Sequence, residues 1–76
     1  MPRGKSNWTF RDVEQFLKAH GFVLHHVRGS HYYFRGYQAK LLRVTHVQYH
    51  GAGSIHPKTL GSIIRQSGIP KEEWME

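Results

Sequence analysis

The stretch FVLHHVRGSHYYFR, residues 22–35, decides the fold of this 76-residue chain. Its two halves are rich in β-branched and aromatic residues, and Gly29 and Ser30 stand between them. Segments of this composition favour strands, and a short break containing glycine is typical of a hairpin. We therefore predict two antiparallel strands, over residues 22–28 and 31–35, joined by a tight turn.

The second of these strands has an orientation that can be assigned, because successive side chains of a strand point to opposite faces. Tyr32 and Phe34 share one face, which we expect to be buried. His31 and Tyr33 share the other face. The pattern thus predicts a histidine at the start of a strand, on the open face of the sheet. In the strands predicted on either side of it, apolar residues occur at both odd and even positions. The sequence therefore does not assign the side chains of those strands to one face or the other.

A helix is predicted before the hairpin, over TFRDVEQFLKAHG, residues 9–21. Thr9 is suited to cap its first turn, and Gly21 can adopt the left-handed conformation that ends a helix. Apolar residues recur on one face of this segment at helical spacing. They are Phe10, Val13, Phe16 and Leu17.

The chain after the hairpin predicts one more strand and one more long helix. GYQAK (36–40) reads as a turn, LLRVTHV (41–47) as a third strand and QYHGAGSIH (48–56) as a loop. The helix begins at Pro57 and ends at Gly68. Its buried stripe consists of Leu60, Ile63 and Ile64.

The order of these elements predicts an α+β fold, with one helical layer over one antiparallel sheet. This is the α-β-β-β-α arrangement of double-stranded-RNA-binding domains, in which the helices pack on one face of a three-stranded sheet. A final short turn, IPKEEWM (69–75), is expected to dock Trp74 on the core. We expect residues 1–76 to form a single domain, with residues 1–8 as a flexible basic tail.

Composition restricts the class of partner and the compartment. Eleven Lys and Arg against five Asp and Glu give a net charge of +6, which favours a polyanionic partner, with nucleic acid first. Solubility alone is the alternative explanation of that charge. The chain has no cysteine, which excludes disulfides and thiolate chemistry. The basic N-terminus is followed by no apolar stretch, so we expect a cytoplasmic protein without a secretory signal or membrane anchor.

Three blocks of the sequence resemble the HicA toxins (YcfA-like proteins), small RNA endonucleases of type II toxin–antitoxin modules. The blocks are FLKAHGFVLHHVRGSHYYF (16–34), VQYHG (47–51) and KTLGSIIRQSGI (58–69). The resemblance implies a double-stranded-RNA-binding-like fold, ribosome-independent cleavage of mRNA and neutralisation by a HicB-type antitoxin in a hetero-oligomer. It also implies that the catalytic histidine is the one in the Gly-Ser-His motif, formed here by Gly29, Ser30 and His31.

The chain departs from the family pattern at two positions. Gln48 stands where members usually have proline, two residues before His50. Lys58 replaces the glycine that usually opens the second helix. Both positions are expected to lie beside the substrate groove, whereas the motif around His31 is intact.

Histidine chemistry explains how such a protein could cut RNA without a metal. RNA carries its own nucleophile, the 2′-hydroxyl, so an enzyme needs to move protons and to hold the phosphate. A histidine with a pKa of about 6.5 suits proton transfer near neutrality. Gly29 permits close backbone approach, and Ser30 offers a hydroxyl and an amide to a phosphate. The residue pattern alone favours a hydrogen-bonding turn residue for a lone histidine, and it is the family resemblance that assigns His31 a catalytic role.

Other side chains are candidates for supporting roles. His50 could be the second proton-transfer partner, a phosphate contact or a loop cap. Tyr33 and Tyr37 could stack on bases or contact the antitoxin. The cations expected near the groove are Arg28, Arg35, Arg43, Lys58 and Arg65. The remaining strand histidines are read as ordinary strand residues; they are His25, His26 and His46.

We expect neither a metal nor a small-molecule cofactor. His46 and His50 could suggest zinc, but no cysteine or nearby acid completes a ligand set. The alternative to a nuclease is an RNA-binding module of the same fold in which His31 only contacts the backbone. A further alternative is a pure interaction protein that has lost activity.

Overall fold

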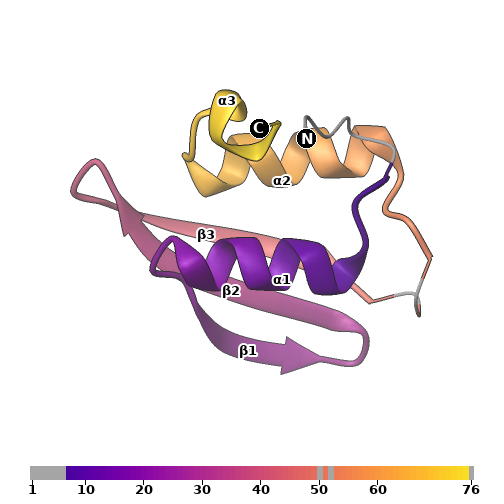
Figure 1. Ribbon diagram of the computed structural model, residues 1–76. Coiled ribbons are helices and arrows are strands. Elements are labelled where there is room, and N and C mark those ends of the chain that lie inside the picture. The colour runs from indigo at the N-terminus through magenta and orange to yellow at the C-terminus, as the bar shows by residue number, and fades with distance from the viewer. Residues whose placement is uncertain (1–6, 50, 52, 76) are drawn as a thin grey trace.

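Six elements follow one another in the computed structural model of the protein, which describes residues 7–49, 51 and 53–75. They are α1 (Phe10–Ala19), β1 (Val23–Arg28), β2 (His31–Gln38), β3 (Leu41–Gln48), α2 (Pro57–Ser67) and α3 (Lys71–Trp74). The strands form one antiparallel sheet in the order β1-β2-β3, and the helices lie on one side of it (Figure 1). The αβββα fold predicted from the sequence is confirmed.

The two long helices begin and end where the sequence predicts. The Thr9 hydroxyl accepts a hydrogen bond from the Asp12 N–H (3.2 Å), and the Asp12 carboxylate accepts one from the Thr9 N–H (3.0 Å), which makes a capping box for α1. At the start of α2, Nδ1 of His56 accepts from the Lys58 N–H at 3.1 Å. Gly68 ends α2 in the left-handed conformation, with φ 72°.

The core lies between the helices and the covered face of the sheet. Its large, nearly inaccessible side chains include Val13, Leu17, Phe22, Phe34, Val47, Leu60, Ile63 and Trp74. Burial of these apolar surfaces is the main force that holds the helices on the sheet. Trp74 is 1 % exposed and docks on this core, as predicted for the C-terminal turn.

Trp8 also belongs to the core, so its assignment to a flexible tail is wrong. Its side chain is 3 % exposed, and its ring centroid lies 5.4 Å from that of Trp74. The Ile55 N–H donates to the Trp8 carbonyl at 2.6 Å and so ties the segment before α1 to the loop before α2. The physical reason is the size of the indole, which gains more from burial than its ordering costs. Residues 1–6 of the predicted tail lie outside the described residues.

The turn between β2 and β3 is shorter than the sequence predicts. Strand β2 continues through Gln38, and only Ala39 and Lys40 connect the strands. Both have positive φ, 54° and 66°, as a two-residue type I′ hairpin turn requires. The predicted turn over residues 36–40 is corrected because Gly36 is a paired strand residue, opposite Arg43.

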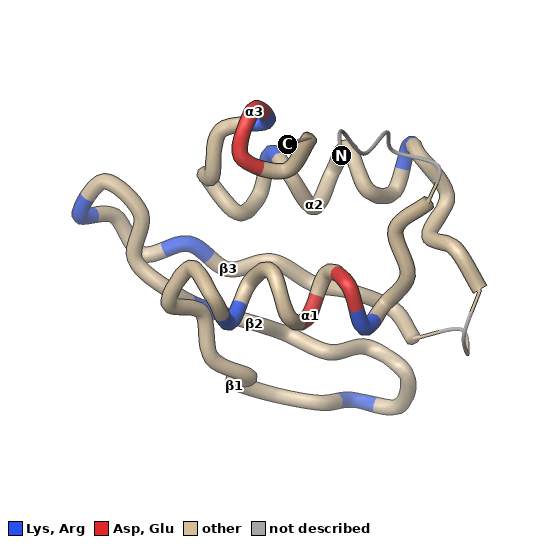
Figure 2. Tube along the Cα trace, in the orientation of Figure 1, with Lys and Arg blue, Asp and Glu red and all other residues tan. Residues whose placement is uncertain are grey.

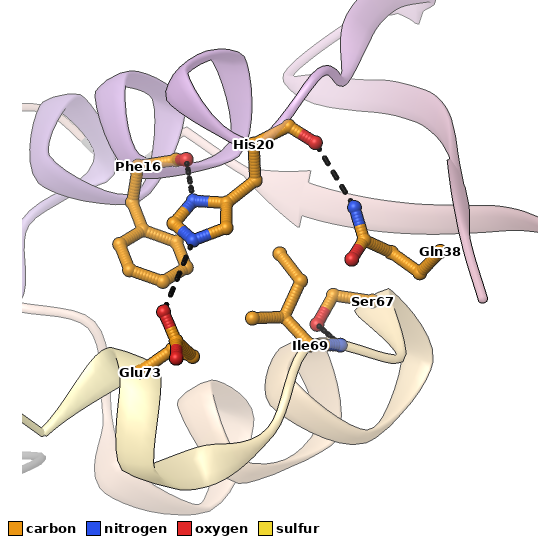
Figure 3. Close-up of polar contacts among 6 residues, drawn as sticks. All are labelled: Phe16, His20, Gln38, Ser67, Ile69 and Glu73. Atoms are coloured by element: carbon orange, nitrogen blue, oxygen red, sulfur yellow. Dashed lines mark hydrogen bonds and ion pairs between the residues drawn. The ribbon is translucent and has the colours of Figure 1, made fainter.

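The C-terminal end of α1 is held by polar contacts that join three parts of the fold (Figure 3). The His20 ring lies 3.0 Å from the Phe16 carbonyl through Nδ1 and 3.6 Å from a carboxylate oxygen of Glu73 through Nε2. The Gln38 side chain donates to the His20 carbonyl at 2.9 Å. These contacts link α1 to α3 and to the end of β2.

No helix within the described ranges is long and apolar enough to cross a membrane. The assignment of the whole chain to one domain stays a prediction.

Candidate active site on the open face of the sheet

Only one face of the sheet is covered by the helices, and the strand register identifies the residues of each face. Phe34, Thr45 and Val47 point into the core and are at most 1 % exposed. Side chains of the opposite parity lie on the other surface, which we call the open face. Around His31 its residues are His26 and Arg28 of β1, His31, Tyr33 and Arg35 of β2, and His46 and Gln48 of β3.

His31 and His46 meet on the open face. In the β2–β3 register His31 is opposite Gln48 and Tyr33 is opposite His46, so the two histidines are diagonal neighbours. Long side chains on a sheet can bridge that diagonal. Nδ1 of His31 lies 2.5 Å from Nε2 of His46. The two rings therefore form a hydrogen-bonded pair between residues 15 positions apart in the chain.

The histidine rings meet edge to edge. Their planes are 20° apart and their centroids 4.7 Å apart. This separation is close to the N···N distance plus the distance from each ring centre to its nitrogen, so both nitrogens lie near the line that joins the ring centres. An imidazole N–H and the lone pair of the other nitrogen lie in the ring plane. The arrangement is therefore that of a hydrogen bond rather than of face-to-face stacking.

Tyr33 fixes the orientation of the His46 ring from the side. The two rings are cross-strand partners, with centroids 5.0 Å apart and planes inclined by 24°. On the other flank of Tyr33, the His26 ring lies 5.5 Å away at 42°. Ring packing of this kind restricts side-chain rotation. A row of rings thus crosses all three strands beside His31.

The Gly29–Ser30 turn leads directly into His31. Gly29 has a φ of 61°, a backbone conformation that glycine adopts without steric cost. The Ser30 carbonyl accepts from the Tyr49 N–H at 2.8 Å. The Ser30 hydroxyl accepts from the side-chain amide of Gln48 at 3.4 Å. The turn is thereby tied to the end of β3, which limits the movement of the strand that carries His31.

The charge on the sheet has one sign. The strands carry Arg28, Arg35 and Arg43 but no Asp or Glu. Within the described residues all carboxylates of side chains lie on α1 and α3, the helices shown with red segments in Figure 2. Since the helices cover the opposite side of the sheet, the open face presents cations without a competing acid. Such a surface favours an anionic ligand.

The environment of His46 favours its neutral form. Partial burial, and second the neighbouring His31, lower the pKa of His46 below the ordinary value of a histidine. Burial disfavours the charged imidazolium, and a like charge on the adjacent ring would disfavour it further. His46 therefore carries an unprotonated nitrogen near neutral pH.

The structure brings some of the predicted site residues together and separates others. Arg28, His31, Tyr33 and Arg35 share the open face, next to Gly29 and Ser30. Lys58 lies in the first turn of α2 and therefore outside this face.

The other predicted cations also lie elsewhere. Arg43 is opposite Gly36 on the covered face, and Arg65 lies on α2, where it donates to the Ser62 hydroxyl at 3.1 Å. His50 lies outside the described residues. The described ranges contain no group of three or more His, Cys, Asp or Glu side chains that could hold a metal ion.

His46 is the site residue that sequence reasoning missed. Its strand shows apolar residues at both parities, and its position relative to His31 depends on the register of β2 and β3. That register follows from the two-residue turn at Ala39–Lys40. Alanine and lysine are not residues that indicate such a turn in a sequence. A recognised type I′ turn would have been sufficient to place His46 diagonal to His31.

A family model described as "HicA toxin of bacterial toxin-antitoxin" matches residues 10–69, which include both histidines of the pair and all of α1, β1, β2, β3 and α2. No curated protein sequence matches the chain.

Proposed function

Because the chain belongs to the HicA toxin family and is therefore a toxin of a toxin–antitoxin module, we propose that it is an endoribonuclease that cleaves mRNA. Its catalytic residue is His31, and its chemistry uses the 2′-hydroxyl of the RNA rather than a metal. The observation that carries this proposal is the placement of His31. The ring is half-buried at the start of β2, on the open face, and its Nε2 has no hydrogen-bond partner within the described ranges.

The proposed reaction moves two protons and exchanges one bond at phosphorus. His31 accepts the proton of the 2′-hydroxyl while the 2′-oxygen attacks the adjacent phosphorus. The bond from phosphorus to the 5′-oxygen breaks, and this leaving oxygen takes a proton from a second donor. His50 remains the candidate for that donor. The products are a 2′,3′-cyclic phosphate and a 5′-hydroxyl, so atoms and charges balance without a cofactor.

Neighbouring side chains supply the binding functions that this scheme needs. Arg28 is opposite His31 across β1 and β2, and Arg35 lies further along β2 on the same face. Both side chains are exposed and can contact RNA phosphates. Tyr33 and the adjacent rings offer surfaces to unpaired bases, as aromatic side chains do in single-strand RNA readers. The placement of these side chains supports RNA as the substrate.

The antitoxin is the second part of the proposal. Family membership implies a cognate antitoxin, and we infer that it is of HicB type and covers the open face. Beside and beyond Arg35 this surface continues in exposed apolar side chains, namely Val23, Tyr37, Leu42 and Val44, which are 47–69 % exposed. Exposed apolar groups in contiguous strands are typical of protein interfaces. Hydrogen exchange of the complex should show protection of β2 and β3 amides, and unchanged exchange there would contradict this placement.

The nuclease is tested by replacing His31 with alanine and following cleavage of a defined mRNA transcript in the presence of EDTA. We expect His31→Ala to reduce the cleavage rate by about 10²- to 10⁴-fold, the usual contribution of a general acid or base. His25→Ala is the matched control, because His25 is an exposed histidine of β1 that has no partner in the β1–β2 register. Circular dichroism should show the same fold in all three proteins.

Four outcomes would overturn parts of the proposal. Equal cleavage by the wild type and His31→Ala would remove His31 from the chemistry. A strict requirement for Mg²⁺ would exclude the metal-independent proton-transfer scheme. Cleavage of a substrate with deoxyribose at the mapped cut site would exclude attack by the 2′-hydroxyl. Tight RNA binding by the wild type without any cleavage would identify a non-catalytic RNA-binding module instead.

A further inference from the structure

The contact between His31 and His46 limits the protonation states that the pair can adopt. Two neutral imidazoles form one hydrogen bond between Nδ1 of His31 and Nε2 of His46, and either ring can be the donor. If His46 donates, His31 must hold its own proton on Nε2 and has no free lone pair there. If His31 donates, its Nε2 is unprotonated and free to act as a base.

The proton that His31 takes up in the proposed reaction decides between these arrangements. A protonated imidazole carries N–H groups on both nitrogens and has no acceptor. The contact can therefore survive the reaction only if Nε2 of His46 accepts the Nδ1–H of His31. The same arrangement before the reaction leaves Nε2 of His31 ready to accept a proton, so no ring has to turn between the two states.

The surroundings of His46 suit an acceptor. Partial burial and the neighbouring His31 lower its pKa, which keeps it neutral. Tyr33 packs against its ring at 5.0 Å. The backbone on either side is held to α2, because the Thr45 hydroxyl donates to the side-chain carbonyl of Gln66 at 3.0 Å and the His46 N–H points to the same oxygen at 3.4 Å. Because the His46 ring is already held in place, it loses little further conformational entropy when it forms the hydrogen bond to His31.

We infer that His46 is a positioning residue of this site, whose Nε2 accepts the Nδ1–H of His31 and so presents Nε2 of His31 to the RNA 2′-hydroxyl. The inference rests on the proposed nuclease function for its chemical meaning, but the hydrogen bond itself can be observed without RNA. His46 takes the place that a carboxylate or a carbonyl occupies in other histidine sites, where a second group sets the tautomer. A neutral acceptor does this without adding a negative charge that would repel the phosphate.

The charged and titratable groups that face the pair are few. On β1, Arg28 is opposite His31 and His26 is opposite Tyr33. On β2, Arg35 is a diagonal neighbour of His46 on the same face, and the Tyr33 hydroxyl belongs to the ring that packs on His46. No helix covers this face, and the described strands contribute no carboxylate to it. Among the residues that the structure describes, His46 is therefore the one whose side chain is hydrogen-bonded to Nδ1 of His31.

The experiment combines a spectroscopic readout with two variants of opposite chemistry. Nitrogen-15 chemical shifts of the His31 ring, measured at a pH where it is neutral, report which nitrogen carries the proton. His46→Phe keeps a ring against Tyr33 but has no acceptor. His46→Gln offers a side-chain carbonyl in place of Nε2. His25→Phe is the control for replacing a strand histidine with phenylalanine.

We expect His31 of the wild type to carry its proton on Nδ1. His46→Phe should mix the two tautomers and reduce kcat by about 10- to 100-fold, with little change of KM, the range typical of residues that orient a catalytic ligand. His46→Gln should recover most of both properties, and His25→Phe should match the wild type.

Two results would overturn the inference. One is a wild-type His31 protonated on Nε2 in the neutral state, a measurement that needs no variant to fold. The other is a His46→Phe protein with the nitrogen shifts and kcat of the wild type. A wild type that cleaves no RNA would refute the proposed function alone, and the nitrogen shifts would still decide whether His46 accepts from His31.

Discussion

Replacing Gly36 with alanine should destabilise the protein through a contact that the fold makes unavoidable. Gly36 is buried in the central strand β2, and its φ is not positive, so alanine can adopt its backbone conformation without strain. A Cβ at this position would lie 2.9 Å from Cγ, 3.0 Å from Cδ1 and 3.1 Å from Cα of Phe22. Carbon atoms in ordinary contact are about 3.5–4.0 Å apart, so Phe22 must move.

The magnitude follows from how tightly Phe22 is held. Its side chain is 2 % exposed, and its N–H donates to the Leu17 carbonyl at 2.9 Å, so ring and backbone both resist displacement. Overpacking of this kind costs about 1–3 kcal/mol. Alanine recovers about 0.5–1 kcal/mol of the entropy that a strand glycine loses on folding. We expect a net loss of about 1–2 kcal/mol, against a total of roughly 4–11 kcal/mol for a domain of this length.

Thermal unfolding followed by tryptophan fluorescence measures this loss, since Trp8 and Trp74 are both buried. At about 4–8 °C per kcal/mol, the Tm of Gly36→Ala should fall by about 5–15 °C. Gly53→Ala is the matched control, because an added Cβ meets nothing within 4 Å there. A Gly36→Ala protein as stable as the wild type would refute the reasoning. So would a double variant with Phe22→Leu in which the two effects simply add, because residues in contact should couple.

Three further predictions address the turn, the histidine pair and the charge of the open face. Replacing Ala39 by Asn and Lys40 by Gly should raise the urea midpoint, with a gain of about 1 kcal/mol, because both residues have positive φ and Asn-Gly suits a type I′ turn; a lower midpoint would contradict this. Because the pKa of His46 is lowered in the folded protein, the unfolded chain binds a proton at this residue more readily than the folded chain does. Neutral His46 therefore contributes fully to the free energy of unfolding above a pH of about 6.5, the ordinary pKa of histidine. This contribution is lost as the pH falls through the lower pKa of the folded state. The free energy of unfolding should thus decline more steeply from pH 7.5 to 5.5 in the wild type than in His46→Gln, and equal slopes would refute it. Arg35→Gln should weaken RNA binding and reduce the slope of log Kd against log salt by about 0.7, whereas Arg65→Gln on α2 should leave the slope unchanged.

Gln48 shows how a departure from the family pattern fits the site. At this position the resemblance to the HicA toxins leads us to expect a proline. Gln48 is directly opposite His31, and its side-chain amide donates to the Ser30 hydroxyl. A proline could neither make this contact nor donate to the strand ladder. The substitution therefore adds a link between the end of β3 and the turn that carries the Gly-Ser-His motif.

The elements that depend on local patterns could be predicted from the sequence. Helical spacing and capping residues located α1 and α2, and the Gly29–Ser30 break located the first hairpin. Strand alternation put His31 and Tyr33 on the face opposite Phe34, because the period of a strand acts between neighbouring residues. The sequence alone therefore determined the fold class and the surface on which the candidate catalytic residue lies.

Only the tertiary structure decided which side chains meet. The pairing of His31 with His46 depends on the register of two strands, and that register is set by Ala39 and Lys40, residues with no turn preference of their own. The burial of Trp8 likewise depends on α3, which follows it by more than sixty residues. Contacts between distant segments arise from packing of the whole core, so a local sequence pattern does not predict them.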